Sequence, residues 1–558
     1  MSFLQANGIE TPYLILPKIN IMAEPCNRVY SSYFPILLIL ALGAFLLLFH
    51  LDHRPFWQDE AETACLAKNV LKYGVPLAYD GVNMISQEQG HEYDENFLWR
   101  WSPWLQIYVT AAAFRLGGLT TFAGRLPFAI LGLMCIFLVY QLVRHNFGDR
   151  AWALWAAALL TCCVPFLLYA RQCRYYSLGA FLTLASLYAF REKWQSKMFP
   201  ALLLCFSLGL LFYANYLLFL SFTGAALLAA GLLYSSEMPL ARSLKLIMAV
   251  GIIILPGLFL FSIQQQAAMV SLGAILANLE NYFGDFFQFM FPLPLGFFLL
   301  WRWGRLLWTR SGLSEAPQEK FILFLSLVVL GNILILTPAP QGEFRYLVHL
   351  YPLCAIVLGW IVCRAWRYQK FSGVLLAMLL LGTNWLYVLP MDWLGIISRP
   401  VHNDPHMLIY PNLPLKLYIS ELSSPYPDVN QNLIRFFQTH ARPGETILTA
   451  YGDLPLQFYT PYRVFGGLGG PIVETQPPDW LVPRWYTRWN RQYDLNESEV
   501  LIRQLLAHST DYRPIILPAE DEIFGNQPDP FFHRFIPPIE SIAPLIVYEK
   551  NPPTRQKP

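Results

Sequence analysis

The sequence predicts an α-helical polytopic membrane protein of about eleven transmembrane helices, followed by a small α/β domain at the C-terminal end. The chain has 558 residues, of which 55% are hydrophobic and only 14% charged, whereas soluble proteins are roughly 25% charged. Uncharged apolar runs recur along it, and runs of about 17–20 residues are long enough to cross a hydrocarbon core of roughly 30 Å. After about residue 390 such runs stop, and Pro, Asp, Arg and aromatic residues become frequent.

The apolar runs define the expected spans in order. Tyr33–Phe49 is the first, and we interpret it as an uncleaved span because no small-residue cleavage site follows a short apolar core. The run 198–236 is long enough for two crossings around Asn215. The remaining expected spans are 126–143, 151–170, 177–190, 246–263, 286–301, 321–337, 346–363 and 371–390.

The stretch 103–118 decides the orientation, because it is apolar but contains Arg115. If it lies along the membrane surface, one set of loops holds 14 Lys or Arg residues, while the opposite set holds only Arg171, Arg174 and Arg345. Basic residues concentrate in cytoplasmic loops. The sequence therefore favours eleven spans, with 103–118 as a juxtamembrane helix on the outer side.

This topology divides the chain into three parts. Residues 1–32 are expected to be a cytoplasmic segment, and residues 33–390 a transmembrane domain whose outer loop 52–125 carries juxtamembrane helices. Residues 391–558 are expected to form an extracytoplasmic domain. Within that domain the sequence predicts helices at Asn430–His440 and Val500–Ala507 and strands at Thr446–Ala450 and Ile515–Leu517.

Asp59 and Glu60 lie just after the first span, at its outer end. Ionisable groups at a membrane boundary are costly unless water or a partner meets them, so they indicate function. The alternative is that this acidic pair caps the helix expected at Ala61–Tyr73, whose N-terminus favours negative charge. The two roles are compatible, and we expect Asp59 to be a general base supported by Glu60.

The second candidate feature is the group of outer arginines, Arg171, Arg174 and Arg345, each accompanied by nearby tyrosines such as Tyr175 and Tyr346. A guanidinium binds phosphate oxygens through two parallel hydrogen bonds. The alternative is that each arginine reaches toward lipid head groups without a chemical role. Together, a carboxylate and these cations predict a base that deprotonates an acceptor hydroxyl while a lipid phosphate departs.

Cofactor signals are weak. The nine cysteines lie mostly in apolar runs and show no zinc-type spacing. The cluster His91–Glu95 offers oxygen ligands for a divalent cation, and a solvated acidic loop is the alternative. There is no GxGxxG, P-loop or Asp-x-Asp motif. The sequence therefore indicates that no cofactor is required, and nothing in it points to nucleic acid.

Several segments in order resemble the GT-C membrane glycosyltransferases that use polyprenyl-phosphate sugars. The similarity is greatest to bacterial relatives of protein O-mannosyltransferases and of the lipid A aminoarabinose transferase. It lies in 57–61, 115–118 with 124–127, 147–153, 171–177 and 344–352. One departure is Trp101–Trp104, where relatives often have His-Pro-Pro-Leu. The Trp-Trp-Asp signature of oligosaccharyltransferases is absent, which argues against en bloc transfer to asparagine.

The resemblance implies an inverting glycosyltransferase, with Asp59 as catalytic base and Glu60 in support. It implies that Arg171, Arg174 and Arg345 hold the donor phosphate, assisted by Tyr175 and Tyr346, without a metal. The expected partners are a polyprenyl-phosphate-linked sugar, membrane lipids and a lipid, glycan or protein acceptor. The expected location is a bacterial inner membrane, with the site on the periplasmic side. A non-catalytic translocator or binding protein for lipid-linked sugars remains the alternative.

Overall fold

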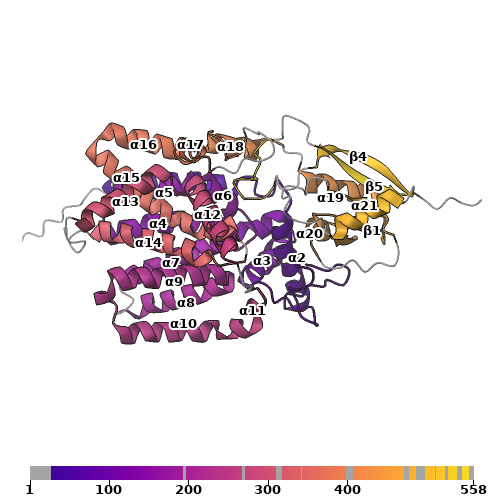
Figure 1. The fold of residues 1–558 in the computed structure, drawn as a ribbon, viewed down its shortest axis with the longest axis horizontal. Helices are drawn as coiled ribbons and strands as arrows, with labels where there is room; N and C mark the ends of the chain where they lie inside the picture. Colours follow the sequence, from indigo (N-terminus) through magenta and orange to yellow (C-terminus); the bar gives the residue numbers. More distant parts are fainter. Residues whose placement is uncertain are drawn as a thin grey trace, which may run out of the picture.

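The computed structural model describes most of the chain. The described residues are 27–192, 197–266, 271–308, 317–340, 342–396, 406–425, 428–469, 477–484, 497–508, 511–521, 526–536 and 543–551. The expected cytoplasmic segment 1–32 therefore lies almost entirely outside them. Along its longest axis the molecule has a helical bundle at one end, helices α2, α3 and α20 in the middle, and a β-sheet domain at the other end (Figure 1).

The bundle is built from the apolar runs of the sequence. One close contact is between α15 and α5, where a Cβ at Gly359 would lie 2.6 Å from the backbone nitrogen of Ala156. Small residues allow helices to approach in this way. The bundle consists of α1 (Asn27–Leu48), α4 (Thr121–Phe147), α5 (Arg150–Thr161), α6 (Val164–Ala170), α7 (Tyr176–Arg191), α8 (Met198–Ala214), α9 (Tyr216–Leu233), α10 (Leu240–Leu260), α12 (Leu272–Phe289), α13 (Leu293–Trp308), α14 (Pro317–Leu336), α15 (Tyr351–Tyr368), α16 (Lys370–Gly382) and α17 (Trp385–Trp393).

Among the described residues, five helices are long and apolar enough to cross a membrane, or up to eight if each of three bent pairs forms one span. The eleven expected spans are not all single long helices, because several of the apolar runs are bent or short. The pairs α5–α6, α12–α13 and α16–α17 bend by 66°, 102° and 81°. Pro292 lies in the break between α12 and α13, and Pro165 is the second residue of α6, just after the first break. Proline removes a backbone donor. Helices α1 and α8 are apolar but shorter.

Helix α12 was not expected, because the sequence predicted an outer loop over 264–285. Its run Leu272–Phe289 contains Asn278, Glu280 and Asp285, so its composition is less apolar than that of the neighbouring spans. The helix begins at Ser271, whose side chain accepts a hydrogen bond from the backbone N–H of Ala274. A search for long uncharged runs therefore missed it.

The surface of the bundle that would face lipid is apolar. Helix α10 has only 11% of its most apolar window buried, and Leu240, Ile247, Met248, Ile252 and Phe259 are all exposed along it. Soluble monomeric proteins rarely expose contiguous apolar patches of this kind. This face therefore fits the hydrocarbon region of a bilayer.

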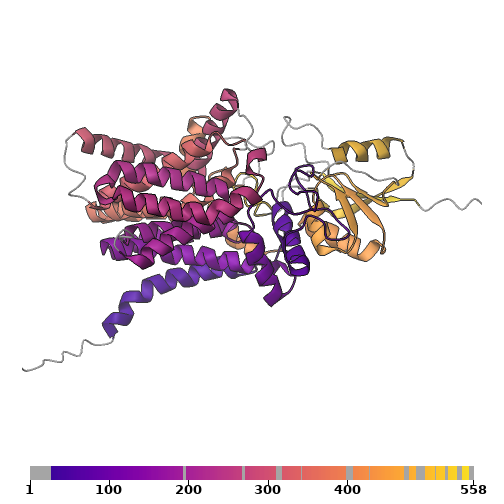
Figure 2. The same ribbon diagram turned by 90° about the horizontal axis from the view of Figure 1, so that it is seen from below.

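The middle layer is formed by the segment 52–125, which the sequence predicted to be an outer loop. Helix α2 (Gln58–Tyr73) packs against α3 (Leu105–Gly117), and α3 in turn packs against α4. With 13 residues and a rise of about 1.5 Å per residue, α3 is too short to cross the membrane. It lies beside α2 between the bundle and the sheet (Figure 1), as expected of a juxtamembrane helix. Figure 2 shows α1 running along one side of the bundle toward this layer.

The C-terminal domain contains a five-stranded sheet in the order β2-β1-β3-β5-β4. Strand β1 pairs in parallel with β2 and β3, whereas β5 is antiparallel to β3 and β4. The two helices and two strands expected here are present, with bounds shifted by a few residues. The elements are α18 (Pro414–Ser423), α19 (Val429–His440), β1 (Thr446–Thr449), α20 (Asp453–Tyr459), β2 (Arg463–Gly466), β3 (Trp480–Val482), α21 (Glu497–His508), β4 (Tyr512–Glu520) and β5 (Pro544–Lys550).

This domain docks directly on the outer loop. Helix α20 packs against α2, where Gln58 Nε2 donates to Asp453 Oδ1 at 2.8 Å. The hydroxyl of Tyr459 accepts a hydrogen bond from the backbone N–H of Phe56 at 2.9 Å. Asn83 also bonds to the backbone of β2, receiving the N–H of Val464 at 2.8 Å. The C-terminal domain therefore fixes the segment that carries Asp59.

Candidate active site

Helix α2 begins with the two acidic residues, and Glu60 is the one that locks the helix in place. Its carboxylate is fully buried and accepts hydrogen bonds from Arg125 Nε at 2.8 Å and Nη2 at 2.6 Å. It also accepts the backbone N–H of Cys173 at 2.7 Å and of Trp57 at 3.4 Å. The last contact is the capping role considered from the sequence. Glu60 therefore ties α2 to α4 and to the turn after α6.

Asp59 immediately precedes Glu60 in the same turn and has different partners. Its Oδ2 accepts a hydrogen bond from Arg345 Nη1 at 2.6 Å and from Arg174 Nη2 at 3.3 Å. Only 8% of Asp59 is exposed. Arg345 comes from the 3-10 turn Phe344–Leu350 before α15, and Arg174 from the turn between α6 and α7. Three distant segments thus bring one carboxylate and two guanidiniums together at the end of the bundle next to α2 and α3.

Glu62 is a further member of the cluster. Arg174 Nη1 donates to Glu62 Oε1 at 2.7 Å and to the Thr63 hydroxyl at 3.1 Å, and Gln87 Nε2 donates to Glu62 Oε2 at 2.6 Å. Burial raises the pKa of Glu62, and the charge of Arg174 opposes that shift. Residues three apart share one face of a helix. The spacing between Asp59 and Glu62 could therefore have predicted that both side chains belong to the site, but the prediction from the sequence did not use it.

Arg171 lies elsewhere, although it was expected to join Arg174 and Arg345. Its Nη1 donates to the carbonyls of Leu46 at 2.9 Å, Leu47 at 3.3 Å and Phe49 at 2.9 Å, and its Nη2 to that of His50 at 2.8 Å. These are carbonyls at the end of α1, which lack partners within the helix. A cation is also favoured at that end by the helix dipole. In the structure, Arg171 therefore caps α1.

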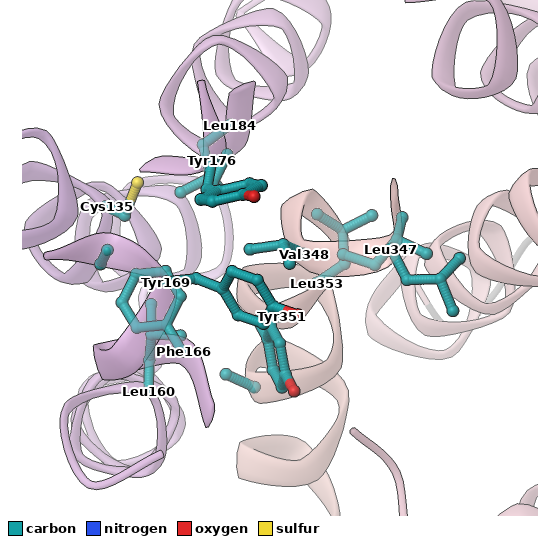
Figure 3. Packing of buried hydrophobic residues seen from close by; sticks show 14 of the residues in the cluster. Cys135, Leu160, Phe166, Tyr169, Tyr176, Leu184, Leu347, Val348, Tyr351 and Leu353 are labelled. Carbon is teal, nitrogen blue, oxygen red and sulfur yellow. The ribbon is translucent and has the colours of Figure 1, made fainter. Parts of the chain in front are cut away.

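The tyrosines form an aromatic wall beside the cluster. Tyr175 and Tyr346 adjoin Arg174 and Arg345 in sequence, and Tyr175 is 5% exposed. The ring of Tyr175 lies 4.7 Å from that of Tyr176, which lies 4.8 Å from Tyr169. Figure 3 shows Tyr169, Tyr176 and Tyr351 reaching into the same space from separate segments. Tyr176 was not singled out from the sequence, yet its buried hydroxyl has no hydrogen-bond partner among the described residues.

The C-terminal domain also contributes to the site, which the sequence did not indicate. Asp529 is 5% exposed, and its Oδ1 accepts a hydrogen bond from the Tyr169 hydroxyl at 2.7 Å. Burial raises the pKa of Asp529 to about 6, and the charge of Arg345 opposes this shift while Glu343 and Asp59 add to it. Burial likewise raises the pKa of Tyr451, and the charges of Asp59 and Asp453 add to this rise.

The His91–Glu95 loop is organised around a carboxylate. Glu92 is fully buried and accepts hydrogen bonds from the Ser86 hydroxyl at 2.7 Å and from the backbone N–H of Glu88 at 2.7 Å. Its oxygens therefore serve the loop itself. Within the described part of the chain, no group of three or more His, Cys, Asp or Glu side chains is arranged to hold a metal ion.

The comparisons with known proteins identify the fold. No protein-family model matches the chain, and no curated protein matches it in sequence. Among solved structures, it matches ArnT from Cupriavidus metallidurans bound to undecaprenyl phosphate. That match has a TM-score of 0.50 and 15% identity, covering 78% of this chain and 86% of that one. The chain has the GT-C fold of membrane glycosyltransferases.

Two more distant matches belong to the same fold. The Archaeoglobus fulgidus oligosaccharyltransferase has a TM-score of 0.46 and 12% identity over 88% of this chain and 70% of that one. The arabinosyltransferase EmbB from Mycobacterium smegmatis has a TM-score of 0.39 and 16% identity over 68% and 32%. At these scores we draw no argument from them. The fold expected from the sequence is therefore present.

Proposed function

We propose that the protein is an inverting glycosyltransferase that moves a sugar from a polyprenyl-phosphate donor to a hydroxyl acceptor at the outer face of the membrane. One observation carries the proposal, namely that Arg174 and Arg345 both pair with Asp59 at the outer end of a GT-C bundle. A carboxylate is a candidate base, and two guanidiniums are candidate holders of a phosphate. The ArnT structure bound to undecaprenyl phosphate supports this donor class.

The resting ion pairs couple the two roles. With Arg345 Nη1 at 2.6 Å, Oδ2 of Asp59 is already occupied by an ion pair. A donor phosphate would compete for the same guanidiniums and release the carboxylate. Binding of the donor would thus free Asp59 to act as a base, so Asp59 would not accept a proton before the donor phosphate is in place.

The reaction is a single displacement. The acceptor oxygen forms a bond to the anomeric carbon, the bond from that carbon to the phosphate oxygen breaks, and the acceptor proton passes to Asp59. The electron pair leaves with the polyprenyl phosphate, whose added negative charge Arg174 and Arg345 stabilise. Attack opposite the leaving group inverts the anomeric configuration. Because a charge-stabilised phosphate leaves readily, this route needs no metal.

The other predicted residues support this arrangement. Glu60 and Arg125, paired at 2.6 Å, hold the first turn of α2 so that Asp59 faces the arginines. Tyr175 and Tyr346 flank the arginines and offer aromatic surface to the donor. Arg171 acts indirectly, by fixing the end of α1 beside α2.

The positions of the basic residues along α15 support the orientation of the site relative to the membrane. Helix α15 begins six residues after Arg345, and Arg364 and Arg367 lie in its last turns, about 20–24 Å from its first residue at a rise of about 1.5 Å per residue. Basic residues at that far end support a cytoplasmic assignment for it. The site and the C-terminal domain would then be extracytoplasmic, which in a bacterium is the periplasmic side of the inner membrane.

Reconstituted transfer is the decisive experiment. The purified full chain in lipid nanodiscs is mixed with polyprenyl-phosphate sugars and hydroxyl acceptors, and products are identified by mass spectrometry. Envelope lipids and glycans from cells with and without the protein supply the acceptor candidates. We expect a sugar that depends on the protein. Polyprenyl-phosphate binding without any transfer, and with no missing sugar in the cells, would instead favour a translocator or binding protein for lipid-linked sugars.

A further inference from the structure

The connection between β4 and β5 leaves the sheet and packs on the membrane domain. Within its described part, 526–536, Asn526 Nδ2 donates to the Pro55 carbonyl at 2.8 Å. His533 Nε2 lies 2.9 Å from Glu421 Oε2, and Arg54 Nη2 donates to the Arg534 carbonyl at 3.3 Å. Phe535 is 1% exposed and belongs to the main hydrophobic core. This segment is therefore held at both ends.

Asp529 lies between these anchors and faces the site. Its Oδ1 accepts the Tyr169 hydroxyl at 2.7 Å, and the nearby ring of Phe531 packs against Phe289 and Phe344, with centroids 6.3 and 6.4 Å away. The titratable and charged groups facing Asp529 come from α2, α6, α7, α12 and the turn before α15. They are Asp59, Tyr169, Tyr176, Asp285, Glu343 and Arg345.

We propose that Asp529 is a positioning residue of the transferase site, which acts by competing with Asp59 for the charge of Arg345. The inference rests on the proposed function and deepens it, because it makes the C-terminal domain part of the catalytic machinery. Asp529 interacts with Arg345 through charge at longer range and not as a paired carboxylate, and a second negative charge near a guanidinium weakens its attraction for the first carboxylate. Asp529 therefore loosens the resting pair between Arg345 and Asp59, so that Asp59 is released more easily as a base.

The same charge has an opposite effect on the donor. A buried carboxylate near Arg345 subtracts from the positive potential that attracts a phosphate, and burial limits the screening of that effect by water and salt. Asp529 thus favours turnover at the expense of donor affinity. A residue with only a structural function would not produce this combination, because a misfolded site loses turnover and affinity together.

The charge on Asp529 also depends on pH. Burial raises the pKa of Asp529 to about 6, so its charge appears as the pH rises through that value. Turnover of the wild-type protein should therefore include a rising step near pH 6. Without the carboxylate, that step should be absent.

Three variants separate charge from structure. Asp529→Asn keeps the shape and an oxygen that accepts the Tyr169 hydroxyl but removes the charge, whereas Tyr169→Phe removes the hydrogen bond and keeps the charge. Glu549→Gln is the matched control, because it removes a carboxylate that pairs with Arg513 between β4 and β5. Transfer kinetics, direct binding of polyprenyl phosphate and thermal unfolding are measured for each full-length protein from pH 5 to 8.

For Asp529→Asn we expect kcat to fall on the order of tenfold at pH 7.5, the donor KM to fall roughly threefold, and the step near pH 6 to disappear. Tyr169→Phe should retain the step but move it to higher pH, because the hydrogen bond from Tyr169 lowers the pKa of Asp529, and Glu549→Gln should resemble wild type. An unchanged kcat and pH step in folded Asp529→Asn would overturn the inference, as would a lower kcat with weaker phosphate binding. A wild-type protein that binds the lipid phosphate without transferring a sugar would instead overturn the proposed function.

Discussion

Arg345 Nη1 lies 2.6 Å from Asp59 Oδ2, although 286 residues separate the two in the chain. The contact joins the first turn of α2 to the turn that precedes α15, and both segments lie at the outer end of the bundle. A buried ion pair between segments so distant constrains the fold, because breaking one partner leaves the other charge unpaired. Its position beside Arg174 also makes it the centre of the proposed chemistry.

Replacing the base tests the chemistry most directly. Asp59→Asn keeps the size of the side chain and an oxygen for Arg345, so the fold should persist, but the amide cannot accept the acceptor proton. General base catalysis contributes roughly 10²–10⁴-fold, and we expect a loss of transfer of that order in the nanodisc assay. Glu95→Gln, an exposed carboxylate in the same outer loop, is the control. Substantial transfer by Asp59→Asn would remove Asp59 from the catalytic step.

The two arginines of the cluster should affect donor use. Arg345→Ala and Arg174→Ala each remove a guanidinium from Asp59, and we expect a higher donor KM together with a lower kcat, because the departing phosphate loses a cation. Titration of polyprenyl phosphate alone should show weaker binding. Arg115→Ala removes an exposed guanidinium of α3 on the same outer side and should leave binding unchanged. Normal phosphate affinity in both site variants would contradict this assignment.

Arg171 should behave differently from its neighbour Arg174. Arg171→Ala removes a donor from four carbonyls at the end of α1. Those of Leu46 and His50 keep Tyr418 and His53 as donors, so the cost comes mainly from the other two, and an unsatisfied buried group costs about 1–3 kcal/mol. We expect a lower unfolding temperature in detergent but an unchanged donor KM for the folded protein. Arg171→Lys should recover part of the stability. If Arg171→Ala instead keeps its stability and loses affinity for the lipid phosphate, the original sequence prediction for this residue is right.

These residues show what a sequence pattern can predict. The positive-inside bias placed Arg174 and Arg345 on the side of Asp59, and the structure brings all three together. The same reasoning grouped Arg171 with them, because the side of the membrane on which a turn lies does not indicate where each side chain in that turn points. Residues 171–175 lie between α6 and α7 and have no helical periodicity, so two arginines three positions apart point to different partners.

Other site features depend on the tertiary fold alone. Asp529 and Tyr169 are 360 residues apart, and neither local spacing nor composition relates them. The bends within the spans could not be predicted for a related reason. An uncharged run shows that a segment suits lipid, but Pro165 and Pro292 sit where the helix axis bends, so one run does not always form one straight span.

The joint between the domains should make stability depend on pH. Burial raises the pKa of Asp453 to about 7, while the hydrogen bond from Gln58 opposes that shift. In the unfolded chain the pKa of an Asp is about 3.9. Between these values the folded protein binds a proton that the unfolded chain does not, so stability is highest at low pH in this window and falls as the pH rises to about 7. The slope for one such group is about 1.4 kcal/mol per pH unit.

Asp453→Asn isolates this contribution, because the amide keeps an oxygen for Gln58 and carries no charge at any pH. The wild-type protein should gain stability as the pH is lowered from 8 to 5.5, and the variant should gain less. The measurement is the free energy of unfolding, or the unfolding temperature, of both proteins at each pH in the same detergent. Asp479→Asn serves as the control, since that carboxylate bonds to Thr446 within the sheet domain. Parallel pH profiles for wild type and Asp453→Asn would show that Asp453 is ionised in the folded protein throughout this range.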